Sequence, residues 1–451
     1  QAKTGESRPW LGSRRHGAPS ELVVPTSAAM SARRGSGSAE HVRVEVVTPG
    51  AGVVASLRLP ADASVAAVKS AVQRQTGVPS IKQRLLLGTE ILDDVRSLQE
   101  LAPKEDPTLT VTMLRRGHLA LSGGCDHSLR LWDLASGEAL GDMRGHGSGV
   151  SCLAADWSRG RALSGSDDHT LRLWDLRSGE ALHTLQGHQD FVHCVAADWA
   201  SERALSGSED RTLCYWDLAT GRAIHFLSGH VGCICCMSVD WASLRALSGS
   251  DDHTMCLWDV DSGRALRQFR GHMDCVYCIS ADWAAGRALS ASMDWTLRQW
   301  DLASGHTLRV LSGHEGVVGC LTVDWPTCRA LTGSDDCTLR LWDVERGHEL
   351  GLLAGHACSV LCLVADWSSE KALSGGEDNV LLLWDLRSAG LLLRLEGHTH
   401  IVRCVAADWA SSLAVSGSKD CTVRLWSLDS GEALKVLEGH EGSIWCMALE
   451  Q

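Results

Sequence analysis

Apolar and polar residues alternate in short runs along most of this chain, and Gly, Asp and Ser separate the runs. One stretch contains four such runs, at Val192–Ala197, Arg203–Gly207, Thr212–Asp217 and Ala223–Leu227. Short alternating runs bounded by turn residues predict half-buried β-strands. Because the same four-strand pattern recurs to the end of the chain, residues 118–451 predict an all-β domain built from repeated units.

The repeated unit has a fixed length. Trp-Asp pairs begin at Trp132, each later Trp lies 42 residues after the last, and Trp426-Ser427 makes the eighth copy. A Gly-His pair keeps the same step from His146 to His440. A period of about 40–45 residues with these two marks resembles the WD40 family, whose repeats each form one four-stranded blade of a β-propeller. The resemblance implies an eight-bladed propeller.

The first and last repeats are incomplete. The first supplies only three runs, at Leu119–Ser122, Leu129–Asp133 and Ala139–Met143, and a single run, Ile444–Leu449, stands at the C-terminus. Pairing the two would close the ring and remove the exposed sheet edge of an open array. We therefore expect strand 444–449 to complete the first blade.

The WD40 resemblance also implies a buried hydrogen-bonded tetrad in each blade. In one repeat its members are His146, Ser164, Asp168 and Trp174. A buried His and Asp are tolerated only when they are paired. Since these residues share the period of the fold, we interpret them as structural and not as a catalytic triad, and we expect no enzymatic activity and no cofactor. A second Trp, from Trp157 to Trp409, is expected to pack between adjacent blades.

Residues 40–116 follow a different pattern. Alternating Val residues at Val42–Val46 indicate a strand, and Val65, Val68 and Val72 fall at helical spacing between Ser64, a candidate N-cap, and Gly77, a candidate stop. The stretches that then resemble ubiquitin are Gln83–Gly88, Leu98–Leu101 and Thr108–Val111. The resemblance implies an α+β β-grasp domain.

This ubiquitin-like domain departs from ubiquitin at two places. Arg115-Arg116-Gly117-His118 runs into the repeats where ubiquitin ends in Gly-Gly, so conjugation to targets is not expected. The positions that match ubiquitin's partner-binding patch are Leu86, Thr110 and Thr112, which keep only part of its apolar character.

Composition narrows the class of protein. Residues 1–39 are rich in Ser, Arg and Gly and predict a disordered tail. The net charge of −13 disfavours nucleic acid as a partner, because such binding depends on neutralising phosphates. No apolar run approaches the ~20 residues of a membrane span. We expect a cytoplasmic protein, with the nucleus as the alternative.

The cysteines are placed with the same period. Eight of the 18 share one repeat position, where a small buried side chain is expected. Two C-x-x-C spacings, Cys233/Cys236 and Cys275/Cys278, could supply zinc ligands. However, predicted strands run straight through both spacings, so a metal site is disfavoured.

Positions that break the period are the candidates for function. In WD40 rings the third and fifth residues after Gly-His, and the residue before the tetrad Asp, usually face the upper surface. From these positions, and from the turn that contains Trp295, we choose seven candidate partner-binding residues. They are Phe191, His193, Tyr277, Met293, Trp295, Arg403 and Trp445. Aromatic and Met side chains are typical of protein-binding surfaces; neutral variation is the rival interpretation.

Two hypotheses for function follow. The first is a non-enzymatic scaffold that holds other proteins on the propeller, with the ubiquitin-like domain recruiting a further partner. The second is an adaptor or substrate receptor of a cullin-RING ubiquitin ligase. It rests on Trp-Asp-x-Arg sequences, which resemble a ligase-docking motif and place Arg177 and Arg387 at its fourth position; two such Arg could also arise by chance.

Overall fold

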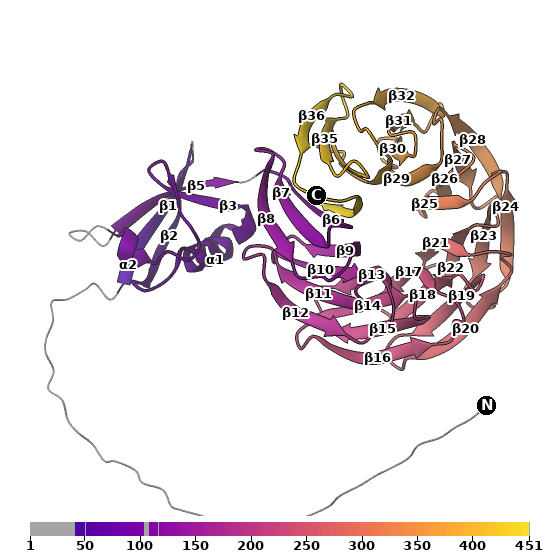
Figure 1. The fold of residues 1–451 in the computed structure, drawn as a ribbon, viewed down its shortest axis with the longest axis horizontal. Helices are drawn as coiled ribbons and strands as arrows, with labels where there is room; N and C mark the ends of the chain where they lie inside the picture. The colour runs from indigo at the N-terminus through magenta and orange to yellow at the C-terminus, as the bar shows by residue number, and fades with distance from the viewer. Residues whose placement is uncertain (1–40, 50, 103–107, 116, 451) are drawn as a thin grey trace, which may run out of the picture. The chain divides into compact units, whose positions relative to one another are not determined.

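The computed structural model describes residues 41–49, 51–102, 108–115 and 117–450, drawn as ribbon in Figure 1. The tail predicted at 1–39 lies outside these residues. Two kinds of architecture follow along the chain, a small mixed sheet with helices and then a long series of antiparallel sheets.

The first region is a five-stranded sheet in the order β2-β1-β5-β3-β4. Strands β1 and β5 run parallel at its centre, and β1 and β2 form an antiparallel hairpin. Its elements are β1 (His41–Thr48), β2 (Gly52–Pro60), α1 (Val65–Thr76), η1 (Ser80–Lys82), β3 (Gln83–Leu87), β4 (Glu90–Ile91), α2 (Leu98–Leu101) and β5 (Thr108–Arg115). This is the predicted β-grasp arrangement.

The predicted signals set the bounds of helix α1. The Ser64 hydroxyl accepts a hydrogen bond from the Ala67 N–H at 3.4 Å, which satisfies one of the free donors of the first turn. Gly77 ends the helix with φ of 74°, a left-handed conformation that costs Gly little. Val68 and Val72 are buried against the sheet, so the helical spacing of the Val residues is confirmed.

The repeats form eight four-stranded antiparallel sheets within the described residues. Strands β6 to β20 are β6 (Leu119–Gly124), β7 (Ser128–Asp133), β8 (Glu138–Arg144), β9 (Val150–Asp156), β10 (Arg161–Ser166), β11 (Thr170–Asp175), β12 (Ala181–Gln186), β13 (Val192–Asp198), β14 (Arg203–Ser208), β15 (Thr212–Asp217), β16 (Arg222–Ser228), β17 (Ile234–Asp240), β18 (Arg245–Ser250), β19 (Thr254–Asp259) and β20 (Arg264–Arg270).

Strands β21 to β37 complete the series. They are β21 (Val276–Asp282), β22 (Arg287–Ser292), β23 (Thr296–Asp301), β24 (Thr307–Ser312), β25 (Val318–Asp324), β26 (Arg329–Ser334), β27 (Thr338–Asp343), β28 (His348–Ala354), β29 (Val360–Asp366), β30 (Lys371–Gly376), β31 (Leu381–Asp385), β32 (Gly390–Leu395), β33 (Val402–Asp408), β34 (Leu413–Ser418), β35 (Val423–Ser427), β36 (Ala433–Leu437) and β37 (Ile444–Leu449). The all-β propeller fold expected from the sequence is therefore confirmed.

Neighbouring sheets are joined by the tetrad Trp and by Arg clamps. Trp216 is fully buried, and it packs against Leu163 and Leu173 of the preceding sheet. Arg161 binds both carboxylate oxygens of Glu202 in the next sheet, at 2.9 and 2.8 Å, and lies 5.5 Å from the ring of Trp199. The prediction that the second Trp of each repeat packs between adjacent blades is confirmed for this pair.

The periodic cysteines pack against a glycine of the neighbouring strand. A Cβ added to Gly165 would lie 2.6 Å from the Cys152 sulfur and 2.7 Å from a methyl carbon of Val192 in the next sheet. Burial raises the pKa of the Cys152 thiol to about 12. This thiol thus behaves as a small apolar side chain. All cysteines in the described part of the chain are free thiols.

The two ends of the repeat region share one sheet, whose strand order is β37-β6-β7-β8. Figure 1 shows the C-terminal strand β37, in yellow, beside β6 in purple. Ile444 and Leu449 of β37 are buried in the core formed with the last full sheet. In addition, the His440 imidazole binds Asp126 at 2.8 Å and Ser122 at 2.7 Å, so one tetrad also spans the two chain ends.

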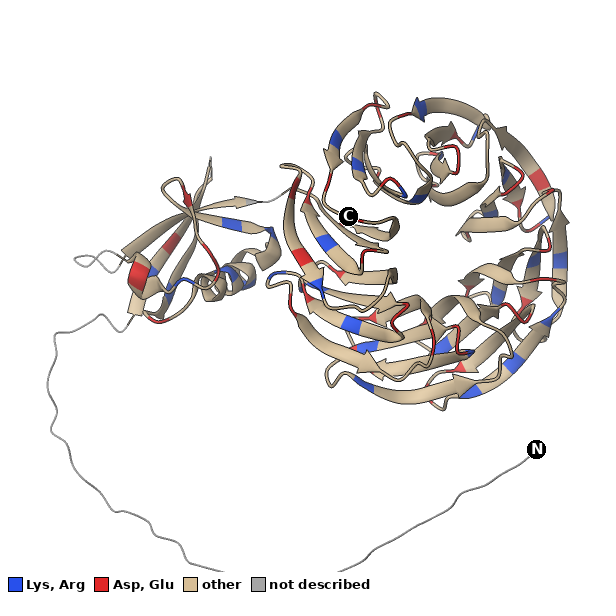
Figure 2. Cartoon of the chain, viewed as in Figure 1, with Lys and Arg blue, Asp and Glu red and all other residues tan. Residues whose placement is uncertain are grey.

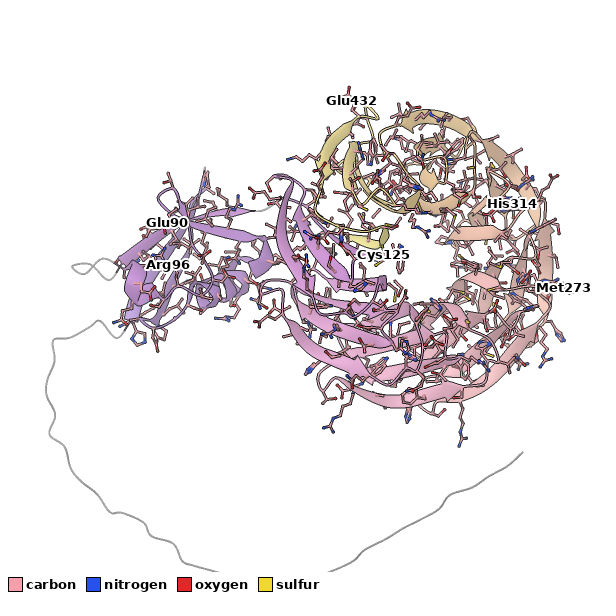
Figure 3. All side chains as sticks on the ribbon, viewed as in Figure 1. Glu90, Arg96, Cys125, Met273, His314 and Glu432 are labelled. Carbon is pink, nitrogen blue, oxygen red and sulfur yellow. The ribbon has the colours of Figure 1, made fainter. Side chains whose placement is uncertain are left out.

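Deleting residues 443–451 should destabilise the whole propeller. The deletion leaves β6 as an unpaired edge and removes buried Ile444 and Leu449. Loss of one large buried aliphatic side chain alone costs about 2–5 kcal/mol. Thermal unfolding followed by circular dichroism should show a lower midpoint, whereas Glu432→Gln, at an exposed position labelled in Figure 3, should leave it unchanged. An unaltered cooperative melt after the deletion would contradict this account of closure.

Candidate functional site

Each sheet of the propeller contains a buried chain of four polar side chains. The Trp174 indole N–H donates to the Ser164 hydroxyl at 2.8 Å, Ser164 binds His146 Nε2 at 2.8 Å, and His146 Nδ1 binds Asp168 at 2.8 Å. An indole can only donate, so the Ser hydroxyl proton is free to bind Nε2 and a neutral His donates Nδ1–H to the carboxylate. In this arrangement every member of the tetrad is satisfied.

The tetrad has the composition of a catalytic triad but not its accessibility. Ser164 is fully buried, and its oxygen already accepts the indole N–H. Burial raises the pKa of Asp168, but hydrogen bonds from His146, Thr170 and the Gly147 N–H outweigh burial and hold that pKa well below its ordinary range. The carboxylate therefore stays ionised and anchors the loop that carries His146. These contacts serve structure.

Asp168 and His146 lie on two loops that meet at one end of the propeller. The Asp167 N–H donates to the Gly149 carbonyl at 3.0 Å, and the Gly147 N–H donates to Asp168 at 2.8 Å. Equivalent contacts recur in other sheets, such as Glu209 N–H to Phe191 O at 2.8 Å. We call this end the upper face. Figure 3 labels three residues of the upper face. Cys125 precedes a tetrad Asp, Met273 follows a tetrad His, and His314 is itself a tetrad residue.

A β-bulge aims the fifth residue after Gly-His out of the sheet. In the pairing of β13 with β14, Val192 opposes Ser208 and Cys194 opposes Gly207, so His193 is an extra residue without a partner across the strands. The same shift occurs around Cys235 and Tyr277. Bulges of this kind redirect a side chain while the strand continues. They explain why this position varies between repeats while its neighbours do not.

An open pocket of about 400 Å³ lies on the upper face across three consecutive sheets, those of β13–β16, β17–β20 and β21–β24. We call it the three-sheet pocket. Its lining residues are His193, Glu209, Cys233, Cys235, Asp251, Cys275, Tyr277 and Met293. The structure thus brings together His193, Tyr277 and Met293, three residues chosen from the sequence.

Two aromatic side chains of the β21–β24 sheet are exposed, Tyr277 in the pocket wall and Trp295 two residues after the lining residue Met293. Tyr277 is 43% exposed and Trp295 is 52% exposed, which is unusual for such large apolar groups. Trp295 adopts φ of 68°, in the left-handed region that is uncommon for a bulky residue. The Phe191 ring makes an edge-on contact with the His169 ring, and the two ring centroids are 5.8 Å apart. The backbone therefore presents these rings to solvent.

Acidic groups also line the three-sheet pocket. Glu209 lies 3.5 Å from His193, and Asp251 is exposed. Around the ring, the position before the tetrad Asp is acidic in five repeats, at Asp167, Glu209, Asp251, Asp335 and Glu377. Figure 2 marks acidic residues in red on the propeller loops. Glu209 and Asp251 were not chosen from the sequence, although their periodic position before the tetrad Asp could have identified them.

Two of the chosen residues lie elsewhere on the ring. Trp445 is on β37, which neighbours β9 and β33 and not the strands of the three-sheet pocket. A Cβ added to Gly149 would lie 2.5 Å from the Trp445 ring, so this side chain packs over the Gly149 backbone of the next sheet. Arg403 is exposed on β33. Trp445 and Arg403 occupy the same repeat position as His193 and Tyr277, so the sequence pattern could not show that they lie outside the pocket.

Comparison with known proteins identifies the fold family. The profile of the WD domain, G-beta repeat, matches residues 137–175, 179–217, 221–259, 263–301, 305–343, 347–385 and 390–427. The chain belongs to the WD40-repeat family. WD40-repeat proteins are generally non-catalytic scaffolds for protein interactions. The Ubiquitin family profile matches residues 46–116, so the N-terminal region is a ubiquitin-like domain.

One solved structure similar to this WD40 chain is described as the crystal structure of the computationally designed Ika8 protein. It aligns with a TM-score of 0.62 and 28% sequence identity over 68% of this chain and 93% of the designed chain. A search of curated proteins found no match. No helix within the described ranges is long and apolar enough to cross a membrane.

The two Arg of the suggested ligase motif lie at the end of the WD40 propeller opposite to the upper face. Arg177 follows the end of β11 and Arg387 follows the end of β31, whereas the tetrad Asp residues precede the starts of these strands. Both residues are exposed. The Arg177 guanidinium lies 3.5 Å from the Asp175 carboxylate.

The C-x-x-C pairs do not form a cluster of ligands. Cys236 contacts the Val276 carbonyl at 3.5 Å and Cys278 contacts the Gly319 carbonyl at 3.3 Å, each in the next sheet, while Cys233 and Cys275 face the three-sheet pocket. Within the described ranges no group of three or more His, Cys, Asp or Glu side chains is placed to hold a metal ion.

The stability of the propeller should depend on pH below about 4. The pKa of each tetrad Asp is depressed in the folded state, so its contribution is complete above the unfolded pKa of about 3.9 and is lost as the pH falls toward the folded value. Replacing Asp168 with Asn should cost about 1.5–3 kcal/mol at pH 7, because hydrogen bonds to a charged group are lost.

The measurement is a series of thermal melts of the wild type and Asp168→Asn between pH 7 and pH 2. The difference between their midpoints should shrink as the pH falls, since acid removes the same charge from the wild type. A difference that stays constant down to pH 2 would show that the charge of Asp168 does not stabilise the fold.

Proposed function

We propose that this WD40 protein is a non-enzymatic scaffold whose three-sheet pocket binds a segment of another protein. The preferred segment carries an apolar side chain next to basic residues. The observation that supports this most is the pocket itself, which combines Tyr277 and Met293 with Glu209 and Asp251 across three sheets.

The apolar part of the pocket has the features of a binding anchor. Tyr277 and Trp295 remain exposed, and Met293 supplies an adaptable surface beside them. Aromatic residues that lose water on contact dominate the energy of many protein interfaces. The backbone at Tyr277 forms a β-bulge, and the Met293 N–H donates a hydrogen bond to the Cys275 carbonyl at 2.9 Å. Because the backbone is already ordered, binding should cost little conformational entropy.

The charged part of the pocket favours a basic segment. Glu209 and Asp251 line it, and the whole chain carries a formal charge of −13. The Nε2 atom of His193 lies 3.5 Å from the Glu209 carboxylate. Charge complementarity of this kind contributes mainly to specificity and association rate, whereas the aromatic contacts contribute to affinity.

We also propose that the ubiquitin-like domain recruits a further protein. Leu86 and Thr112 are paired across β3 and β5 and both are partly exposed, while Thr110 is exposed on β5. This surface matches the position of ubiquitin's partner-binding patch but is more polar. It would give the chain a second contact site separate in sequence from the propeller.

Replacing Tyr277 and Trp295 together by Ala should abolish capture of the main propeller partner. An aromatic anchor of an interface contributes about 2 kcal/mol or more to the binding free energy, so the loss of a single one weakens binding at least roughly 30-fold. The loss of both should weaken it further. The measurement is quantitative affinity purification, in parallel with selection of binding peptides from a random displayed library. Peptides selected by the wild type should combine an apolar residue with Lys or Arg and should not bind the double variant.

The matched control is Leu308→Ala with Leu352→Ala, two exposed apolar residues on the outermost strands β24 and β28. This control should keep the partner, and both variants should melt like the wild type. Glu209→Gln with Asp251→Asn should weaken binding less and reduce its dependence on salt. An unchanged set of partners in the Tyr277/Trp295 variant would refute the proposed pocket.

A second candidate is a substrate receptor of a cullin-RING ligase. The exposed Arg177 and Arg387, on the face opposite to the pocket, support it together with the ubiquitin-like domain. Under this hypothesis Arg177→Ala with Arg387→Ala should remove ligase subunits from the purified complex while the Tyr277/Trp295 variant keeps them. If ligase subunits are absent from the wild-type complex, this candidate is excluded.

A further inference from the structure

Two cysteines from neighbouring sheets meet in the three-sheet pocket. Cys235 lies on the bulged part of β17 and Cys275 directly precedes β21, and their sulfur atoms are 3.4 Å apart. This is the one thiol–thiol contact among the hydrogen bonds of the described residues. The sequence separation of 40 residues means that only the ring arrangement brings them together.

The distance is short enough for a covalent bond to form with little movement. A disulfide needs a sulfur–sulfur distance of about 2.05 Å, so the two atoms must approach by roughly 1.4 Å. Cys235 is half-buried and lies in the pocket wall, whereas Cys275 is 2% exposed. A small oxidant that enters the pocket therefore meets Cys235 first.

The two thiols differ in acidity. The pKa of Cys235 is lowered by its sulfur–sulfur contact with Cys275, in which either thiol can donate, although burial and the Asp251 carboxylate oppose this effect. The pKa of Cys275 is raised by the same contact and by burial of the thiol. Cys235, the more accessible of the two sulfur atoms and the one whose pKa is lowered, is therefore the nucleophile of the pair.

The other cysteines of this region lack these features. Cys194, Cys236 and Cys278 belong to the periodic set between the sheets, and burial raises the pKa of each thiol. Cys233 lies in the same pocket and is also half-buried, but its carbonyl accepts from the Cys235 thiol at 3.8 Å and from the Asp251 N–H at 3.0 Å, and the thiol–thiol contact joins Cys235 to Cys275. Cys233 is therefore a matched control, because its thiol is similarly exposed in the pocket but is not in contact with Cys275.

We propose that Cys235 and Cys275 are a peroxide-sensitive modification site that forms a reversible disulfide between two adjacent sheets inside the pocket. This inference does not depend on the proposed partner of the propeller. Reversible disulfides are the kind expected in a reducing compartment, where cellular thiols restore the reduced form.

The reaction with hydrogen peroxide balances in two steps. The Cys235 thiolate attacks one oxygen, the O–O bond breaks, and the products are a sulfenic acid and hydroxide, which becomes water on taking the Cys275 proton. The Cys275 thiolate then attacks the Cys235 sulfur and displaces hydroxide, which takes a proton from solvent. In total the two thiols lose two electrons, and peroxide is reduced to two waters.

The test uses the full chain in its reduced form. It is treated with a few equivalents of hydrogen peroxide at neutral pH, remaining thiols are alkylated, and the protein is digested with trypsin without reduction. Cleavage at Arg222, Arg245, Arg270 and Arg287 places Cys235 and Cys275 on different peptides. Mass spectrometry should find these peptides joined with the loss of two hydrogens, and dithiothreitol should separate them.

Matched variants assign the bond. Cys235→Ser should abolish the joined species, whereas Cys233→Ser should leave its yield and rate unchanged. Circular dichroism melts establish that both variants are folded, and the wild-type measurement stands without either variant. The proposal is overturned if peroxide oxidises wild-type thiols without joining these two peptides, or if the joined species persists in Cys235→Ser.

Discussion

The hydrogen-bond chain from Trp through Ser and His to Asp is the interaction on which the rest of the propeller depends. Its indole end lies in the apolar core between two sheets, and its carboxylate end holds the loops of the upper face. A buried imidazole and carboxylate would each be costly alone, but joined in one chain they satisfy every polar group. Because this hydrogen-bond chain recurs in every sheet, the loops are attached to the core in the same way around the ring.

The tetrad also explains how the residues of the proposed binding site can vary from one repeat to the next. It holds the residue before each Asp and the residues after each His at set places on the upper face, whatever their side chains are. Bulges then turn the fifth residue outward without disturbing the paired strand. A constant framework can therefore carry a different side chain in each repeat, and one run of three sheets combines aromatic, acidic and thiol groups in a single pocket.

Features that depend on local chemistry could be predicted from the sequence. Ser64 and Gly77 bound a helix because their hydrogen bonding and backbone conformation are local properties. The tetrad was implied by the WD40 resemblance, and three of the chosen residues, His193, Tyr277 and Met293, do line one pocket. Trp445 was grouped with them because it is an aromatic residue at the fifth position after Gly-His, but it covers Gly149 in a different part of the ring.

The sequence by itself determined the strands, their number per repeat and the residues that alternate between core and solvent, because strand pairing and burial follow patterns of two and of 42 residues. Only the tertiary structure decided which variable positions are neighbours. Contacts between adjacent sheets join the fifth residue of one repeat to the third residue of the next, as in Cys235 and Cys275. That pairing depends on how adjacent sheets pack and is not written in either repeat alone.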